Sequence, residues 1–262
     1  MCLILFAYQV HASYPLIVAA NRDENFSRPT RMAQFWPEHP SILAGKDLQA
    51  GGLWLGITRS GRFAALTNYR DPAAKPGNIS RGLIGKEFLL GEQSPDRFLH
   101  TLTKNSDDYS GFNLLIGDNN GLFYYSNRDG SNASKRQSRL EPGVYGLSNH
   151  LINTPWPKIT RGKQLLQKYL ENSSKDLDTN ALIALLQDKT VPPDDALPDT
   201  GIGLDYERIL SPLFIQAPFY GTRSSSALTL SAQGKVRFHE QCYGEKGVKA
   251  DHSVMEFQLE AQ

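Results

Sequence analysis

The chain has 262 residues, of which 40% are hydrophobic, 10% aromatic and 21% charged, as in an ordinary globular protein. A net charge of +1 argues against a broad phosphate-binding surface, so we do not expect nucleic acid as a partner. The two cysteines, Cys2 and Cys242, give no disulfide framework, and there is no signal-peptide pattern or apolar run of about 18 residues. We therefore expect a cytoplasmic protein that does not insert stably into a membrane.

Most predicted strands come in hairpins, in which two apolar runs flank a short turn. In chain order, the runs are 2–8 and 16–20, 54–58 and 62–68, 112–116 and 122–126, 144–148, 226–230 and 236–242, and 255–259. The segment 26–48 has no clear alternation of apolar and polar residues, and we predict that it is irregular.

Helices are predicted between these blocks of strands. One follows a Ser80 cap over 81–90, a second runs from Pro95 to about residue 104 behind a Ser94 cap, a third spans 157–170 and a fourth follows an Asp178 cap. The stretch 190–205, rich in Pro and Asp, is predicted to be a long loop that forms a rim or lid.

The order of these elements predicts the fold class. Strands that pair in hairpins form antiparallel sheets, and helix pairs that follow blocks of strands stack on outer faces. We predict an α+β fold, namely a four-layer αββα sandwich that forms one domain over residues 1–262.

The first 24 residues bring together the groups that most resemble a site. The first hairpin is predicted to carry Asn21–Glu24 to the same end of the sheet as Cys2. If Met1 is removed, Cys2 has both a thiol and a free α-amine, whose pKa near ~8 lets it take a proton from a nucleophile. The alternative is that Cys2 is a small core residue and that the polar run is a solvated turn.

Four further residues complete this candidate catalytic site. Asn68 and Asn149 each end a predicted strand, where their amide N–H groups would stabilise an oxyanion. Arg22 or Arg223 would lower the pKa of the thiol. The alternatives are turn capping for the two asparagines and a structural ion pair with Asp23 or Glu24 for Arg223.

Several segments occur together and in order in one known family. They are Met1-Cys2, Ala20-Asn21-Arg22-Asp23-Glu24, Arg28-Pro29-Thr30, Gly51-Gly52-Leu53-Trp54-Leu55-Gly56, Leu66-Thr67-Asn68-Tyr69-Arg70, Gly146-Leu147-Ser148-Asn149 and Tyr220-Gly221-Thr222-Arg223-Ser224-Ser225. In these segments the chain resembles the NRDE family, also called the transport and Golgi organisation 2 family. That resemblance implies a fold like that of the cysteine N-terminal nucleophile hydrolases. It also implies a function in intracellular haem trafficking, in which a haem chaperone binds haem and passes it on.

The related conjugated bile acid and penicillin V hydrolases differ from this chain in one respect. They carry an Asp three residues after their Arg, whereas Asp23 directly follows Arg22 and the third residue after Arg22 is Asn25. Aligning Glu24 with that Asp instead leaves Asn21 in place of the Arg. Because neighbours on a strand point to opposite faces, Arg22 and Asp23 are not both expected to face Cys2. Hydrolysis of a linear amide or thioester is therefore the alternative to haem handling.

For the haem hypothesis, the sequence offers ligands but no covalent attachment motif, since it contains no Cys-x-x-Cys-His. Cys2 would ligate iron as a thiolate, and His150 would lie by the same pocket. The candidate ligand-binding residues, including arginines for the propionates, are Asn21, Arg22, Asp23, Glu24, Arg28, Arg31, His150 and Arg223. We expect no metal site and no resident cofactor, with haem only as a cargo, and the oligomeric state is left open. A third hypothesis, a protein-interaction module in secretion, has no peptide groove or basic amphipathic helix to support it.

Overall fold

The computed structural model describes residues 2–74, 77–130, 137–173 and 176–260. Its contacts divide the chain into two compact units, each assembled from separate stretches of sequence. The first unit comprises Met1–Ser27, Pro142–Ser148 and Ile152–Phe257, and the second comprises Arg28–Glu141, Asn149–Leu151 and Gln258–Gln262.

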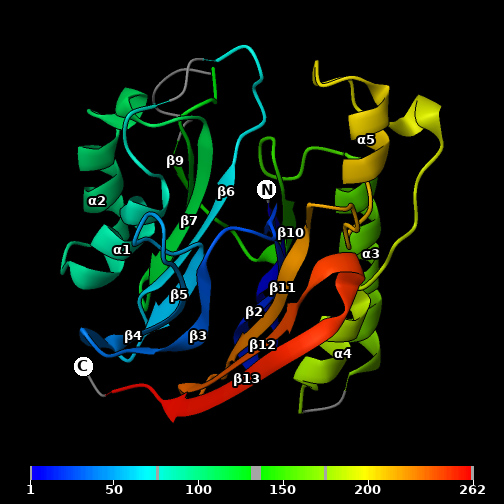
Figure 1. Ribbon diagram of the computed structural model, residues 1–262. Coiled ribbons are helices and arrows are strands. Elements are labelled where there is room, and N and C mark those ends of the chain that lie inside the picture. Colours follow the sequence, from blue (N-terminus) through cyan, green and yellow to red (C-terminus); the bar gives the residue numbers. More distant parts are fainter. Residues whose placement is uncertain (1, 75–76, 131–136, 174–175, 261–262) are drawn as a thin grey trace. The chain divides into compact units, whose positions relative to one another are not determined.

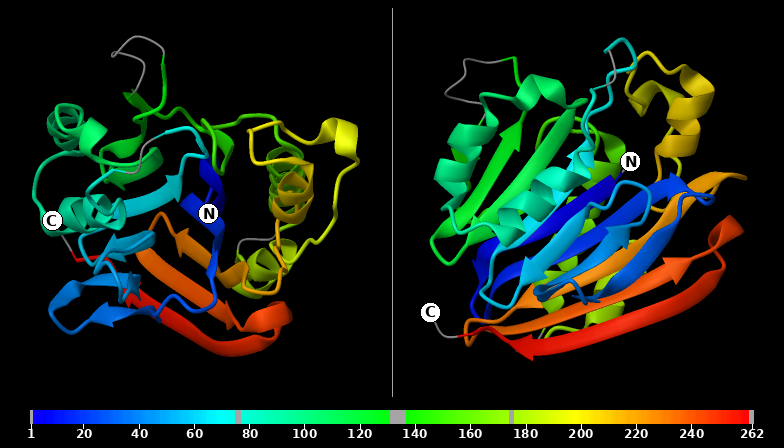
Figure 2. Two further views of the ribbon diagram at one scale, coloured as in Figure 1. Left: turned by 45° about the horizontal axis from the view of Figure 1, so that its top comes forward. Right: turned by 60° about the vertical axis from the view of Figure 1, so that its left-hand side comes forward.

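The first unit is built on a six-stranded sheet with the order β10-β1-β2-β11-β12-β13. Its strands are β1 (Cys2–His11), β2 (Tyr14–Asn25), β10 (Gly143–Leu147), β11 (Tyr220–Leu230), β12 (Lys235–Tyr243) and β13 (Lys249–Gln258). Its helices are α3 (Pro157–Asn172), α4 (Thr179–Leu185) and α5 (Leu204–Leu210). The neighbouring strands β1 and β2, β2 and β11, and β11 and β12 pair antiparallel. Figure 2 shows these strands side by side, with β13 at the edge.

One face of this sheet packs against α3 and α4 (Figure 1). Leu3 and Leu5 of β1 lie in one buried apolar cluster with Leu166 of α3 and Leu182 of α4. Because side chains alternate along a strand, Cys2 and Ile4 point to the opposite face of the same sheet.

The second unit contains a seven-stranded antiparallel sheet with the order β3-β4-β5-β6-β7-β8-β9. The strands are β3 (Thr30–Trp36), β4 (His39–Asp47), β5 (Leu55–Thr58), β6 (Phe63–Asn68), β7 (Phe112–Asp118), β8 (Gly121–Ser126) and β9 (Gln137–Arg139). Two helices, α1 (Gly82–Leu90) and α2 (Pro95–Leu102), lie on one face of this sheet (Figure 1).

The core of the second unit lies between these helices and the sheet. Phe88 of α1 and Phe98 of α2 meet edge to face, with ring centroids 5.2 Å apart, in a cluster that includes Leu114 of β7. The backbone approaches itself closely where the chain enters α1, because a Cβ on Gly52 would lie 2.4 Å from the carbonyl carbon of Gly82. Only glycine fits at that position.

The predicted α+β class is confirmed, since each unit is an antiparallel sheet with helices on one face. The stacking of the two sheets face to face and the single domain over 1–262 stay predictions. All four predicted hairpins form, and the Ser94 and Asp178 caps accept hydrogen bonds from Arg97 N and Asn180 N.

Other predictions were wrong. Residues 26–48 were expected to be irregular, but residues 30–47 form the β3–β4 hairpin. Its alternation is hidden because β3 is only partly buried, β4 is buried on both faces over residues 42–45, and two prolines interrupt the pattern. The N-cap of α1 is Arg81 rather than the predicted Ser80, and it makes no side-chain capping hydrogen bond. The predicted loop 190–205 forms over residues 190–203, with one short 3-10 turn at Asp194–Ala196, but α5 already begins at Leu204. β11 begins at Tyr220 rather than at residue 226. Within the described ranges, none of the helices is long and apolar enough to cross a membrane.

Candidate functional site

The β1–β2 hairpin places Cys2 directly opposite Arg22. This confirms the prediction that the hairpin returns the polar run to the same end of the sheet as Cys2. The hydroxyl of Ser148, just beyond β10, donates a hydrogen bond of 3.0 Å to the carbonyl oxygen of Cys2. Cys2 is thus fixed from both neighbouring strands. Met1 lies outside the described residues, so its removal stays a prediction.

The row that starts at Cys2 continues across the first unit's sheet. Arg22 is directly opposite Ser224 of β11, and Ser224 is directly opposite Cys242 of β12. Since opposed residues share a face, all four side chains lie on the face that points away from α3 and α4. This face therefore carries one guanidinium and two thiols in register.

The guanidinium of Arg22 is the most unusual group in this row. The residue is 6% exposed, and its Nη2 lies 3.9 Å from Oε2 of Glu24. Its Nη1 is buried and has no hydrogen-bond partner among the residues that the structure describes. Leaving a buried donor unsatisfied costs about 1–3 kcal/mol, so this atom favours an anionic acceptor from a ligand.

Cys2 is a neutral thiol in this environment. Burial, the largest cause, raises the pKa of Cys2, and Asp23 and Glu24 act in the same direction while Arg22 opposes them. A thiolate therefore forms only if a nearby base removes the proton or a ligand changes the local charge.

Strand alternation splits the polar run of β2 into two pairs with different surroundings. Arg22 faces the same side as Cys2, whereas Asn21 faces α4 and is fully buried. Nδ2 of Asn21 donates to the carbonyl oxygens of Leu186 at 3.0 Å and Leu213 at 2.8 Å, and Oδ1 accepts from Ser225 Oγ at 2.6 Å. These contacts favour a structural role for Asn21 over the predicted role in ligand binding.

Asp23 lies on the same side as Asn21. Its Oδ1 accepts a hydrogen bond of 2.8 Å from Thr222 Oγ1. Burial raises the pKa of Asp23, while the positive charge of Lys158 opposes the shift. Lys158 is itself buried in the first turn of α3, where its Nζ donates to Leu210 O at 2.8 Å. As expected from strand geometry, Arg22 and Asp23 do not share a face.

Arg223 lies at a β-bulge, where the β2–β11 register shifts between Thr222 and Ser224. Its Nη1 donates to the carbonyl oxygen of Asn25 at 2.8 Å, and its guanidinium carbon is 5.8 Å from the ring centroid of Phe26. Burial, with repulsion from Arg22 second, lowers the pKa of Arg223. This arrangement orders the end of β2, and the proposed effect of Arg223 on the Cys2 thiol stays a prediction.

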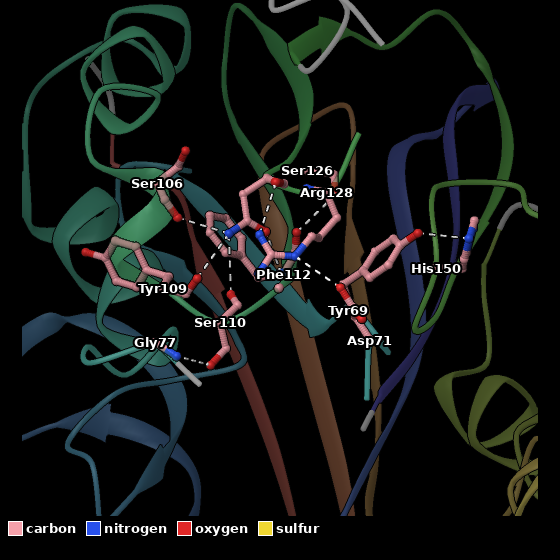
Figure 3. A network of polar contacts seen from close by, with 12 residues as sticks. Tyr69, Asp71, Gly77, Ser106, Tyr109, Ser110, Phe112, Ser126, Arg128 and His150 are labelled. Carbon is pink, nitrogen blue, oxygen red and sulfur yellow. Dashed lines mark hydrogen bonds and ion pairs between the residues drawn. The ribbon is translucent and has the colours of Figure 1, made fainter. Parts of the chain in front are cut away.

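In the second unit, the predicted oxyanion donors contact each other. Nδ2 of Asn149 donates to the carbonyl oxygen of Asn68 at 2.9 Å, and Asn149 is fully buried. This long-range contact engages one amide N–H of Asn149 and only the backbone of Asn68, so the oxyanion role and the alternative of turn capping both stay predictions. The adjacent His150 is half-buried, and its Nε2 lies 2.9 Å from the phenolic oxygen of Tyr69 (Figure 3).

The two remaining predicted propionate ligands lie elsewhere in the second unit. Arg28 binds Asp47 through both Nε and Nη2, the latter at 2.6 Å. Arg31 is exposed on β3. Arg28 is therefore engaged by a carboxylate, and the binding of propionates by Arg28 and Arg31 stays a prediction.

Four residues that contact or lie opposite the predicted site residues were not predicted from the sequence: Ser148, Lys158, Ser224 and Tyr69. Ser148, Ser224 and Tyr69 all lie within the segments that carry the family resemblance, next to residues that were chosen. Lys158 had one signal, a charged residue in the apolar first turn of a predicted helix. No group of three or more His, Cys, Asp or Glu among the described residues is arranged to hold a metal ion.

Comparison with known proteins places this chain. A family model described as transport and Golgi organisation 2 matches residues 1–245. The chain belongs to the transport and Golgi organisation 2 family. Among its relatives, the transport and Golgi organization protein 2 homolog of Bos taurus is 35% identical, covering 100% of both chains. The Homo sapiens homolog is 35% identical over 94% of both, and the Drosophila melanogaster protein is 28% identical over 92% of both.

Two solved structures resemble this member of the transport and Golgi organisation 2 family at low sequence identity. An N-acylethanolamine-hydrolyzing acid amidase ortholog from Caenorhabditis elegans is 12% identical, covers 87% of this chain and 92% of its own, and gives a TM-score of 0.48. A mutant of the conjugated bile acid hydrolase from Clostridium perfringens is 10% identical, with coverage of 99% and 92% and a TM-score of 0.47. Nothing about the chemistry of this chain follows from these two likenesses.

Proposed function

We propose that this protein is a cytoplasmic haem chaperone, which binds haem reversibly and passes it on to other proteins. The observation that carries the proposal is the buried guanidinium of Arg22, whose Nη1 has no hydrogen-bond partner among the described residues. Haem carries two propionate carboxylates, and a carboxylate that accepts from Nη1 removes the cost of a buried unsatisfied donor. The names of the relatives, which include transport, support a role in moving a cargo.

The proposal is tested by titrating the full chain with ferric haem and with the dimethyl ester of haem, which lacks free carboxylates. Haem should bind with a saturable optical change, and the ester should bind more weakly. Arg22→Gln removes one charge-assisted bond, which is worth about 1.5–3 kcal/mol and corresponds to about a ten- to hundredfold loss of affinity.

Arg161→Gln is the matched control, because it removes the same charge from an exposed arginine that pairs with Asp188. It should leave the affinity for haem unchanged, and Cys2→Ala should retain most of it. Transfer of bound haem to apomyoglobin checks that binding is exchangeable. Equal affinity for haem and its ester, or an unchanged affinity for haem in Arg22→Gln, would refute the proposal that Arg22 binds a haem propionate.

The second candidate is hydrolysis of a linear amide or thioester, favoured by the position of Cys2 opposite Arg22. After removal of Met1, the thiol would attack the substrate carbonyl and pass its proton to the α-amine of Cys2. The leaving amine or thiol would depart with that proton, and water would then hydrolyse the thioester formed on Cys2. This candidate alone uses the predicted oxyanion donors Asn68 and Asn149 and the predicted effect of Arg223 on the pKa of the thiol.

Intact mass, measured before and after reaction with a thiol-selective acylating probe, tests the second candidate. Burial raises the pKa of Cys242 to about 12, so Cys242 should stay unmodified at neutral pH. A single fast adduct that survives in Cys242→Ala and disappears in Cys2→Ala would support an activated nucleophile. Retention of Met1 would exclude the mechanism, because Cys2 would then have no free amine.

A further inference from the structure

A cavity of about 330 Å³ lies in the first unit, where β2 and β12 begin and β11 ends. The end of β13 and the segment before α4 complete its walls. Its lining includes three hydroxyl groups, on Tyr14, Thr229 and Ser231, and two cations, Lys235 and Arg237. Small-molecule sites have volumes of roughly 300–1,000 Å³, so the cavity is large enough for a small polar ligand.

The cavity lies on the helix-covered face of the first unit's sheet. Arg237 is directly opposite Thr229 of β11, and Thr229 is directly opposite Ile17 of β2, which belongs to the apolar cluster with α3 and α4. α4 also contacts β11 and β12 (Figure 1). Since side chains alternate along a strand, Arg237 and Arg22 point to opposite faces. This cavity is therefore separate from the row that starts at Cys2.

The guanidinium of Arg237 is only partly used by its protein partner. Its Nη1 donates to Oε1 of Glu256 at 2.9 Å, and Nζ of Lys235 lies 2.9 Å from the other oxygen of the same carboxylate. The Nε atom of Arg237 is buried and has no hydrogen-bond partner among the residues that the structure describes. In a planar guanidinium, the N–H of Nε lies parallel to one N–H of Nη2, and this fork matches two oxygens of one anion. A buried donor without a partner is costly, so Nε favours an acceptor from a ligand.

The charges of the lining favour an anion beside Arg237. Hydrogen bonding from Lys235, opposed by burial and aided by the charge of Arg237, lowers the pKa of Glu256, so this carboxylate is ionised at neutral pH. Two cations then share one carboxylate, which leaves a positive charge for a ligand. Arg237 is half-buried, whereas Asp176 is exposed on the segment before α4 and adds an acceptor at the rim. The complementary ligand carries an anionic group at one end and a hydrogen-bond donor at the other.

We propose that this cavity binds a small phosphate monoester that also carries a hydroxyl group. Two phosphate oxygens accept from the Nε and Nη2 edge of Arg237, and the third accepts from Lys235. Ser231 Oγ accepts from Lys235 N at 3.0 Å, so its own proton is left to bond the ester oxygen. Asp176 accepts from the hydroxyl of the ligand. A carboxylate has only two oxygens and would leave the additional donors without an acceptor, so the cavity should prefer phosphate.

Calorimetric titration of the full chain with glycerol 3-phosphate tests the proposal. The ester should bind saturably, and more tightly than glycerate, in which a carboxylate replaces the phosphate. Arg237→Gln should weaken binding by about ten- to hundredfold, and Arg237→Lys, which keeps the charge but lacks the fork, should weaken it by a similar factor. Arg208→Gln, at an exposed arginine that pairs with Asp194, is the matched control and should leave the affinity unchanged.

Glu256→Gln gives a second test in which affinity should increase. This variant removes the carboxylate that competes for Lys235 and Arg237, so glycerol 3-phosphate should bind more tightly. An unchanged or weaker affinity would contradict the assignment of these two cations to the phosphate.

The same phosphate monoester occurs in free metabolites and in the headgroup of phosphatidic acid. Phosphatidylcholine vesicles with and without phosphatidic acid distinguish these sources: binding only to the vesicles that contain phosphatidic acid assigns the headgroup, and binding of glycerol 3-phosphate alone assigns a free metabolite. No saturable binding of either, equal affinity for glycerate, or full affinity in Arg237→Gln would overturn the proposal. Circular dichroism melts of each variant establish that a lost signal does not come from a lost fold.

Discussion

Asn21 should be the residue of the polar run whose replacement most damages the fold. Its side chain is fully buried and makes three hydrogen bonds, to the carbonyl oxygens of Leu186 and Leu213 and from the hydroxyl of Ser225. Asn21→Ala leaves these groups without that partner, at about 1–3 kcal/mol for each buried group left unsatisfied. Allowing for relaxation, we expect a loss of about 3–6 kcal/mol, against a total stability of roughly 5–15 kcal/mol for a typical domain.

Equilibrium unfolding in urea measures this loss. Ser225→Ala, which removes only one of the three bonds, is the control and should cost about 1 kcal/mol. A loss below about 1 kcal/mol for Asn21→Ala, with an unchanged dependence on urea, would refute the argument that these bonds join β2 to α4 and to the segment before β11. Among molecules that remain folded, haem affinity should be unaltered, since Asn21 faces away from the Cys2 row.

Three further predictions follow from the structure. Burial lowers the pKa of His239 below its usual ~6.5, so the unfolded chain takes up a proton first and stability falls as pH drops below about 6.5; His239→Asn should flatten this slope in thermal melts between pH ~5 and ~8. Arg62 donates to the carbonyl oxygen of Phe88 near the end of α1 and lies 4.0 Å from its ring centroid, so Arg62→Leu should cost about 2 kcal/mol in urea unfolding. Gly52→Ala should prevent correct folding, as judged by a lost cooperative melt, because its Cβ would overlap the backbone of Gly82.

The sequence determined the hairpins and helix starts, because their patterns involve only residues close together in the chain. Alternating apolar residues and turn residues predicted the hairpins, and Ser94 and Asp178 predicted two helix starts, because each of these depends on neighbours a few residues apart. The β3–β4 hairpin was missed for the same reason: β3 is only partly buried, and β4 is buried on both faces over residues 42–45, so neither strand shows a clear alternation.

The tertiary structure decided what each residue of the polar run does. The sequence placed Asn21, Arg22, Asp23 and Glu24 near Cys2 as one group. Register and strand alternation then divided them, so that Arg22 shares a face with Cys2 while Asn21 and Asp23 bind groups from distant segments.

The pairing of Tyr69 with His150, 81 residues apart, could not be read from the sequence either. Each residue directly follows an asparagine, and hydrogen bonds between the two segments, from Asn149 Nδ2 to Asn68 O and from Arg70 N to Asn149 O, hold the two rings together. A linear sequence records which side chains are available, but the distances that make them a site arise from non-local packing.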